Sequence, residues 1–448
     1  MSQAVSVQDE ELGQRAIRKV ARRLVPFISL LYFINYLDRT NIGFAKLTMS
    51  EDLGLTETMF GLASGLFFIG YLCFEIPSNL ALHRFEARRW MARIMVTWGI
   101  VAAAMAFVPT AGWLYSLRVV LGIAEAGFFP GMLVYLTFWF PRKERVRLTA
   151  LFLLAIPISS ALGSPLSAAV IQFGDGLFGL AGWRLMFLVE GLPAILLGLM
   201  TWFYLTDRPA QAKWLSVEER TWLTDTMEAE NAATAQRFHW PLRRALTDLR
   251  VWGLGMVYFG VVYGLYALSF FLPTIVAGFA ETFQTTYSLF ETGLIVAIPF
   301  SVGAVAMVFW SRHSDRTGER VWHVAAPTLL GAVSIPVALY LQSPFAVMFA
   351  VTLTAVGVFC ALPVFWYLPT TFLSGVGAAA GIALINSLGN SSGFAAPFIT
   401  GWLSDTTGSN KAGLWVVGLA MFGAAMLVLL LRAAPRPDQE DRPDDEVD

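Results

Sequence analysis

Four ionisable side chains stand inside long apolar stretches of the sequence: Asp38, Arg39, Arg118 and Glu125. If these stretches cross a lipid bilayer, each charge costs roughly 2.5 to 3.5 kcal/mol to insert near the bilayer centre. A side chain retained at that cost is a candidate for function. The two groups present, guanidinium and carboxyl, suit two tasks, which are binding an anion and carrying a proton.

Arg39 is the candidate for anion binding, because a guanidinium presents planar, paired N–H donors that match the two oxygens of a carboxylate. Tyr36 precedes it by three residues and therefore shares its helical face. This spacing places a phenol hydroxyl beside the guanidinium. We predict that Arg39 and Tyr36 contact an anionic substrate together.

Asp38 and Glu125 are the candidates for proton carriage, since apolar surroundings disfavour the charged form of an acid. Arg118 and Glu125 are seven residues apart, or about two helical turns, so they lie on the same face of a helix. They are about 10 Å apart along the helix axis, so this spacing alone does not bring them into contact. Asp38 and Arg39 are adjacent and diverge by about 100°, so each needs its own partner. We predict that all four residues share one water-reachable chamber.

The elements that position these residues are membrane-spanning helices. Of the 448 residues, 56% are hydrophobic and only 14% are charged, which is more apolar surface than a soluble protein can bury. This composition also excludes a disordered, collagenous, coiled-coil or nucleic-acid-binding protein. Twelve apolar stretches have about the 20-residue length of a helix that crosses a bilayer core. They cover approximately residues 24–46, 59–82, 90–109, 113–139, 148–172, 183–206, 251–279, 287–310, 321–341, 344–372, 376–403 and 414–431.

The distribution of Lys and Arg sets the orientation of these spans, because basic residues are retained on the cytoplasmic side of short loops. Most of the 31 basic residues fall on alternate segments, starting with the N-terminal one, and clusters occur within 15–23, 84–93, 142–147 and 312–320. Both chain ends are therefore predicted to be cytoplasmic. We expect a multi-pass protein of a bacterial inner membrane.

The spans and the loops between them divide the chain into five segments. We predict a cytoplasmic N-terminal segment (1–23), a six-helix bundle (24–206), a cytoplasmic linker (207–250), a second six-helix bundle (251–432) and an acidic, disordered tail (433–448). The bundles repeat each other at an offset of 232 residues, at which Trp90 matches Trp322 and Trp183 matches Trp415. Parallel repeats of this kind place a substrate site between the halves near the middle of the membrane.

Several motifs resemble those of the major facilitator superfamily. Residues 315–320 (DRTGER) resemble its loop signature, and Arg118-x-x-x-Gly122 resembles its fourth-helix motif. More narrowly, the sequence is similar to the anion:cation symporter family, which includes bacterial carriers of sugar acids, tartrate and phthalate. This similarity is carried by residues 36–41 (YLDRTN), 74–79 (FEIPSN), 125–126 (EA), 368–370 (LPT) and 386–390 (NSLGN).

The resemblance implies a fold and a set of roles. The fold would be all-α, with 12 transmembrane helices in two pseudo-symmetric six-helix bundles and both termini cytoplasmic. The acids Asp38 and Glu125 would take up protons. Arg39 would engage the substrate, and Arg118 would couple proton to substrate.

Four further positions are candidate substrate contacts. Tyr71 and Asn390 match positions that family members use for polar contacts with substrate, and we add Asn386 and Trp366. Hydrogen bonding between helices is the alternative for the two asparagines, and aromatic packing is the alternative for Trp366.

Structural roles are open for other residues as well. Arg118 could tie its span to backbone carbonyls, and Asp38 could pair with Arg118. For two more acids in apolar stretches, Glu75 and Glu190, we expect structural helix contacts rather than proton carriage. Packing is also the more common explanation of three tyrosines in the seventh span, which are Tyr258, Tyr263 and Tyr266.

Two departures from the family pattern bear on gating and on the substrate. His83 stands where the first-half loop signature usually has Asp, which predicts a weaker inner gate in that half. In the fifth span, residues 155–159 (AIPIS) lack the amide side chain typical of sugar-acid carriers. This favours a less hydroxylated anion, such as an aromatic or small dicarboxylate, although tartrate stays open.

Together these features predict a proton-coupled symporter that imports an organic carboxylate by alternating access. Tartrate, a sugar acid and an aromatic carboxylate such as phthalate are the candidate substrates. Protons are required because an inside-negative potential opposes anion entry by about 2.3 kcal/mol per charge per 100 mV. A proton-coupled efflux antiporter of drugs or metabolites is the alternative on the same fold.

Enzyme activity is not expected. No nucleophile arrangement or metal-ligand cluster is apparent, and Cys73 and Cys360 have no Cys or His neighbours in the sequence. We predict no cofactor, no metal and no nucleic-acid partner. The expected partners of the protein, which we predict to be a monomer, are a small organic anion, protons and the lipid bilayer.

Overall fold

The computed structural model describes residues 7–141, 144, 152–237, 247–370 and 375–433. Within these ranges every regular element is a helix, which confirms the predicted all-α fold. The apolar sequence accounts for this result, because a chain inside hydrocarbon must satisfy its backbone N–H and C=O groups within one segment.

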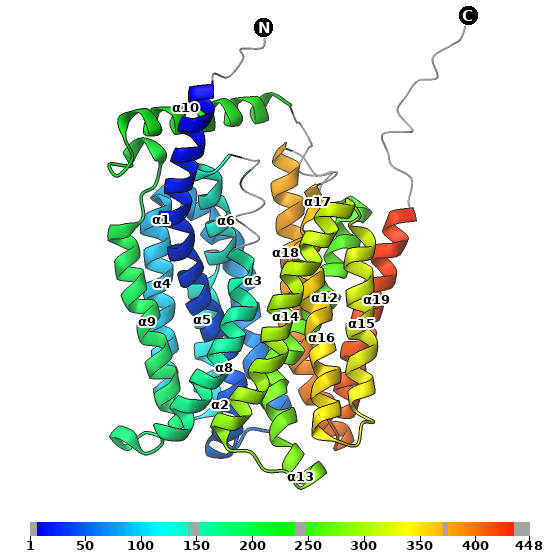
Figure 1. Ribbon diagram of the computed structural model, residues 1–448. Coiled ribbons are helices and arrows are strands. Elements are labelled where there is room, and N and C mark those ends of the chain that lie inside the picture. The colour runs from blue at the N-terminus through cyan, green and yellow to red at the C-terminus, as the bar shows by residue number, and fades with distance from the viewer. Residues whose placement is uncertain (1–6, 142–143, 145–151, 238–246, 371–374, 434–448) are drawn as a thin grey trace, which may run out of the picture.

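Most of the helices run side by side along the length of the molecule (Figure 1). The first half contains α1 (Val7–Thr40), α2 (Ile42–Leu53), α3 (Glu57–Phe85), α4 (Ala87–Ala104), η1 (Met105–Phe107), α5 (Ala111–Glu125), α6 (Phe128–Trp139), α8 (Ala155–Phe173), η2 (Leu177–Gly179) and α9 (Gly182–Tyr204). The segment between the halves contains η3 (Pro209–Gln211) and α10 (Val217–Arg237). The second half contains α12 (Leu249–Ala277), α13 (Phe279–Phe283), α14 (Leu289–Thr317), α15 (Val321–Ala338), α16 (Pro344–Phe365), α17 (Tyr367–Thr370), α18 (Gly375–Thr407) and α19 (Lys411–Ala433).

The helices coincide with the predicted membrane spans. Eleven helical stretches in the described ranges are long and apolar enough to cross a membrane, and α18, with 33 residues, occupies the remaining predicted span. Four spans consist of two consecutive helices, which are α1 with α2, α5 with α6, α12 with α13, and α16 with α17. Two of these breaks, after α1 and after α5, lie beside the charged residues singled out in the sequence.

One end of the molecule is identified as cytoplasmic by its basic residues and by its linker. The helix α10 lies across this end, and α1 starts and α19 finishes there, whereas α2 and α13 lie at the opposite, outer end (Figure 1). Basic side chains concentrate on the cytoplasmic face of membrane proteins. The observed arrangement therefore agrees with cytoplasmic chain ends.

The N-terminal segment differs from its expected boundary. The first predicted span begins at residue 24, but α1 already begins at Val7 and is continuous through Thr40. Lys19 Nζ lies 3.0 Å from Glu219 Oε2 on α10, and Arg15 Nε lies 3.5 Å from Glu219 Oε1. The polar start of the chain is thus a helical extension of the first span, stabilised by its contact with α10.

The two halves touch closely at the outer end. A Cβ atom added to Gly61, in the first turns of α3, would collide with the carbonyl oxygen of Pro397 on α18. A Cβ atom added to Gly293, near the start of α14, would stand 2.8 Å from the carbonyl oxygen of Ser164 on α8. Small residues at such positions allow helix backbones to approach each other. Both contacts join a helix of the first half to a helix of the second.

A polar contact reinforces this outer seal. The carboxylate of Asp405, near the end of α18, accepts hydrogen bonds from the backbone N–H groups of Glu57 (3.2 Å) and Thr58 (2.8 Å) at the start of α3. An acidic side chain at a helix N-terminus satisfies N–H groups that have no partner within the helix. The outer side of the molecule is therefore closed in this structure.

We predict that Gly61→Ala weakens the outer seal. The added methyl group collides with a backbone atom, and overpacking of this kind costs about 1 to 3 kcal/mol, which shifts the population of a two-state carrier roughly 5- to 150-fold. The readout is labelling of a Ser164→Cys variant by a membrane-impermeant maleimide added outside, which should become faster. Gly423→Ala is the matched control, because a Cβ atom there meets nothing within 4 Å. Equal labelling rates in the two variants would contradict the prediction.

Candidate functional site

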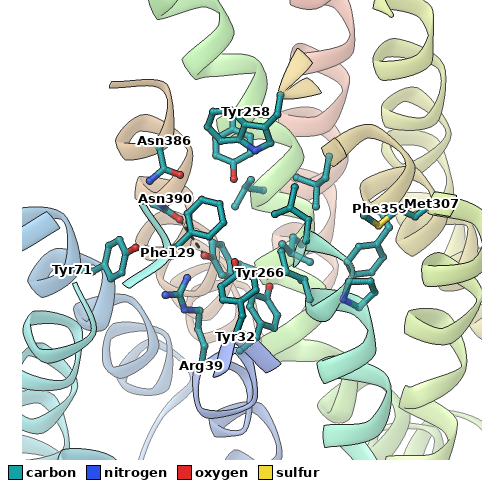
Figure 2. Close-up of a pocket in the computed structure, with 18 residues that line it drawn as sticks. Tyr32, Arg39, Tyr71, Phe129, Tyr258, Tyr266, Met307, Phe359, Asn386 and Asn390 are labelled. Carbon is teal, nitrogen blue, oxygen red and sulfur yellow. Dashed lines mark hydrogen bonds between the residues drawn. The ribbon is translucent and has the colours of Figure 1, made fainter. Parts of the chain in front are cut away.

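A cavity lies between the two halves of the molecule, and its 18 lining residues come from both (Figure 2). The first half contributes Tyr32, Tyr36, Arg39, Tyr71, Phe129, Leu153, Ile156 and Pro157, and the second contributes Tyr258, Val262, Leu265, Tyr266, Met307, Phe359, Leu362, Trp366, Asn386 and Asn390. Arg39 is the one charged residue among them. The cavity therefore presents a cation among phenol hydroxyls, carboxamides and apolar side chains, a combination that suits a small anion.

Arg39 lies in the last turn of α1, just before the break at Asn41, and is 5% exposed. Its Nη2 donates a hydrogen bond to Glu125 Oε1, and the two side chains form a buried ion pair. The rings of Phe67 and Tyr71 lie 5.2 Å from the guanidinium carbon. The Arg39 Nε–H has no hydrogen-bond partner among the described residues. The guanidinium is thus held by Glu125 and two rings while part of its donor set stays available.

Glu125 is the last residue of α5 and is fully buried. The chain turns here because Gly127 adopts a φ of +85°, a left-handed conformation that favours glycine. A Cβ atom at Gly127 would also collide with Ser78 on α3. Glu125 Oε1 accepts a hydrogen bond from Arg39, but Oε2 has no partner in the described part of the chain. Glu125 does not line the cavity, so its link to the cavity is Arg39.

Asp38 points away from the cavity. Its Oδ2 accepts a hydrogen bond from Trp98 Nε1 on α4 at 2.8 Å, and the residue is 1% exposed. The expected single chamber shared by all four charged residues is therefore not formed, because Arg39 lines the cavity and the other three do not. The physical reason is that neighbouring helical residues point about 100° apart. Arg39 faces the gap between the halves, and Asp38 faces the interior of its own half.

Arg118 ties α5 to α3. Its Nε donates to the carbonyl oxygen of Ala63 (3.1 Å) and its Nη2 to that of Ser64 (3.4 Å). The motif Arg118-x-x-x-Gly122 explains this reach, because a Cβ atom at Gly122 would collide with the Phe67 carbonyl and glycine lets the helices approach. Arg118 therefore ties its span to backbone carbonyls, which is one of the structural roles left open by the sequence. An ion pair between Arg118 and Asp38 is not present among the described contacts.

All of the other predicted substrate contacts line the cavity. They are Tyr36, Tyr71, Trp366, Asn386 and Asn390. Tyr266 Oη donates to Asn390 Oδ1 at 3.3 Å. Trp366 packs edge-on against Tyr258, with ring centroids 4.9 Å apart. Figure 2 shows Tyr71, Asn386 and Asn390 around the space in front of Arg39.

Sequence reasoning missed part of the aromatic wall. Tyr32 lines the cavity, and its signal was present, because Tyr32, Tyr36 and Arg39 follow the spacing of one helical face. Tyr258 and Tyr266 also line the cavity, so packing alone does not describe them, whereas Tyr263 does not line it. The lining residues on α16, Phe359 and Leu362, had no charged neighbour in the sequence to mark them.

The two other acids that are buried in membrane-spanning helices make helix contacts. Glu190 on α9 accepts hydrogen bonds from Asn41 Nδ2 (2.9 Å) and Ser167 Oγ (2.7 Å), all within the first half. Glu75 on α3 reaches across to α18, where it accepts from Asn386 Nδ2 at 2.6 Å. The side chain of His83 lies outside the described part of the structure. No group of three or more potential metal ligands occurs among the described residues.

We predict strong energetic coupling between Arg39 and Glu125. Removing one member of a buried ion pair leaves the other charge without a partner, so Arg39→Met should destabilise the protein by about 3 to 5 kcal/mol. The double variant Arg39→Met/Glu125→Leu should recover most of that loss, as measured by thermal unfolding of the detergent-purified protein. Arg184→Met combined with Glu125→Leu is the control pair, since the described contacts of Arg184 are hydrogen bonds to two backbone carbonyls and the ring of Trp183, and none is with an acid. The prediction would be contradicted if the stability losses of the single variants were additive in both pairs.

Comparison with known proteins agrees with this architecture. The sequence matches the Major Facilitator Superfamily over residues 28–397. It is 50% identical over 428 residues to a protein of Agrobacterium vitis named "Putative tartrate transporter", covering 95% of this chain and 97% of that protein. It is 39% identical over 417 residues to a quinolone resistance transporter of Acinetobacter baumannii, covering 93% of this chain and 95% of that protein. Its fold is similar to that of the xylose transporter XylE from E. coli in a partially occluded, inward-open conformation, with a TM-score of 0.72 at 14% identity, covering 94% of this chain and 99% of that chain. The chain therefore belongs to the major facilitator superfamily and is a multi-pass membrane transporter.

Proposed function

We propose that the protein is a proton-coupled symporter that imports a small organic carboxylate by alternating access, with tartrate as the leading substrate. The observation that carries the proposal is the ion pair between Arg39, which lines the cavity, and Glu125, which lies behind it. Tartrate is preferred because of the name of the relative that is 50% identical over nearly the whole chain.

Competition for Arg39 supplies the coupling in this proposal. A substrate carboxylate and the Glu125 carboxylate both need the same guanidinium, and charges attract strongly in a low-dielectric interior. When Glu125 takes up a proton it loses its charge, and Arg39 becomes available to the substrate. Proton and anion then bind better together than either does alone, which is the thermodynamic condition for symport.

Charge balance explains why more than one acid is useful. An inside-negative membrane opposes each entering negative charge by about 2.3 kcal/mol per 100 mV, so two protons would neutralise a dicarboxylate in transit. Asp38 is the proposed second proton carrier. It is buried, it accepts one hydrogen bond from Trp98, and within the described ranges its Oδ1 has no partner. Arg118 is proposed to make α5, which ends at Glu125, move together with α3 through its two hydrogen bonds to backbone carbonyls.

Alternating access is proposed to arise from rocking of the halves, residues 24–206 and 251–432, about the cavity, with residues 207–250 linking them. The closed outer side, with Gly61 against Pro397 and Asp405 against the start of α3, represents one end of this motion. Opening of the same contacts would admit substrate from outside. The small residues at this interface suit a contact that must form and break repeatedly.

A second candidate function is proton-coupled efflux, which is supported by the similarity to a quinolone resistance transporter. The aromatic wall of the cavity could accept a planar drug. The lone charged lining residue, however, is a cation, and it favours an anionic ligand over a cationic one. The direction of transport and the charge of the ligand separate the two functions.

Transport by the purified protein in liposomes tests the proposal. Labelled tartrate should accumulate above its external concentration when a proton gradient is directed inward, and a protonophore should abolish that accumulation. Phthalate and a sugar acid are tested as competitors, because each is a candidate substrate. Proton-driven export of a fluoroquinolone with no carboxylate uptake would replace symport by efflux.

We predict that Glu125→Gln separates binding from accumulation. Glutamine cannot exchange a proton, so uphill uptake should fall to the equilibrium level, whereas exchange of labelled for unlabelled tartrate persists because Arg39 is retained. Glu281→Gln on the outer helix α13 is the control and should accumulate substrate normally, since Glu281 is exposed and distant in the fold from the cavity. Undiminished uphill uptake by Glu125→Gln would remove Glu125 from the mechanism.

A further inference from the structure

Glu75 is a buried acid that supports the cavity wall without lining it. It lies one helical turn after Tyr71 on α3 and is 3% exposed. Its Oε1 accepts a hydrogen bond from Asn386 Nδ2 at 2.6 Å, and its Oε2 accepts from Ser387 Oγ at 3.3 Å. Asn386 lines the cavity and Glu75 does not. A carboxyl group of the first half therefore holds, from behind, an amide of the second half that faces the cavity.

This contact determines which end of the Asn386 amide is available to a ligand. A carboxylate can only accept hydrogen bonds, so it engages the NH2 group of the carboxamide. The Asn386 oxygen then points away from Glu75 and has no partner among the described hydrogen bonds. Asn386 consequently offers the cavity an acceptor, which a hydroxyl group of a ligand can satisfy and a second carboxylate cannot.

The neighbouring asparagine has the opposite polarity. Asn390 lies one turn further along α18, about 6 Å away along the helix axis at 1.5 Å per residue. Its Oδ1 accepts from Tyr266 Oη, which leaves its NH2 group for the cavity. Asn386 and Asn390 lie on the same wall in Figure 2. This wall thus presents an acceptor beside a donor, the pattern needed by a carbon chain that carries both a hydroxyl and a carboxylate.

We propose that Glu75 is a positioning residue that fixes Asn386 as the acceptor for a substrate hydroxyl and so makes the carrier selective for hydroxycarboxylates. This inference rests on the proposed function, because it assumes that a carboxylate of the substrate binds Arg39. An analogue without the hydroxyl leaves the Asn386 oxygen unpaired in a largely enclosed cavity. A site built to hydrogen-bond a hydroxyl discriminates strongly against the analogue that lacks it.

The test compares tartrate with succinate, which has the same carbon chain and both carboxylates but no hydroxyl. The inhibition constants of both compounds are measured against labelled tartrate uptake in liposomes, for the unmodified protein and for Glu75→Leu and Glu75→Gln. The unmodified protein should prefer tartrate by about tenfold or more, the difference caused by one unmade buried hydrogen bond. Glu75→Leu frees the Asn386 amide to rotate and should bring this ratio close to one, mainly by weakening tartrate.

Glu75→Gln is the conservative variant, because its side-chain oxygen can still accept from the Asn386 NH2 group. It should keep the preference for tartrate although the charge is gone. A residue that only stabilised the fold would lower both affinities together and would not change their ratio. Ser387→Ala, which removes the longer contact to Glu75 and leaves the Asn386 bond, should also keep the preference.

Three results would overturn the inference. The ratio of the succinate and tartrate inhibition constants could be unchanged in Glu75→Leu, it could fall equally in Glu75→Leu and Glu75→Gln, or the unmodified protein could show no preference for tartrate. If Glu75→Leu does not fold, Asn386→Leu takes its place, since it removes the acceptor directly and should likewise bring the ratio close to one. Absence of any carboxylate uptake by the unmodified protein would instead reject the proposed function itself. The two failures are therefore distinguishable.

Discussion

The buried ion pair between Arg39 and Glu125 is the constraint on which the cavity depends. Each charge would be unfavourable alone in the middle of the protein, and each is made tolerable by the other. Both residues occupy helix ends, Arg39 at the end of α1 and Glu125 at the end of α5, where the turn at Gly127 lets the carboxyl face a neighbouring helix. Phe67 lies close to the guanidinium groups of both Arg39 and Arg118, at 5.2 and 5.1 Å, so one ring helps to shield both cations.

The two halves repeat a pattern of sequence, but they differ in the polar and charged side chains that they bury. Within the described ranges the acids buried in the membrane-spanning helices, which are Asp38, Glu75, Glu125 and Glu190, all belong to the first half. The second half contributes neutral polar groups, Asn386 and Asn390, while the aromatic rings of the cavity come from both halves. Among the lining residues the charge is thus on the side of the first half, and the carboxamides are on the side of the second.

The outer contacts between the halves are of a different kind. Gly61 against Pro397 and Gly293 against Ser164 are close backbone approaches, and hydrogen bonds of Asp405 and Gln172 to helix N-termini of the other half add to them. The cross-half hydrogen bonds of Glu75, by contrast, lie at the cavity itself. The seal and the cavity wall are therefore built from separable interactions.

Apolar stretch length determined the number of spans, Lys and Arg determined their orientation, and the cost of a charge in lipid identified Arg39 and Glu125, because all three effects act locally along the chain. The spacing of Tyr36 before Arg39 also placed both on one cavity face. Only the tertiary structure decided the partner of each buried charge. Asp38 accepts a hydrogen bond from an indole on α4, Arg118 donates to carbonyls on α3, and Glu75 accepts from an amide 311 residues away. Helical periodicity specifies the direction of a side chain on its own helix, but the partner in that direction depends on how distant helices pack, and no local pattern records that.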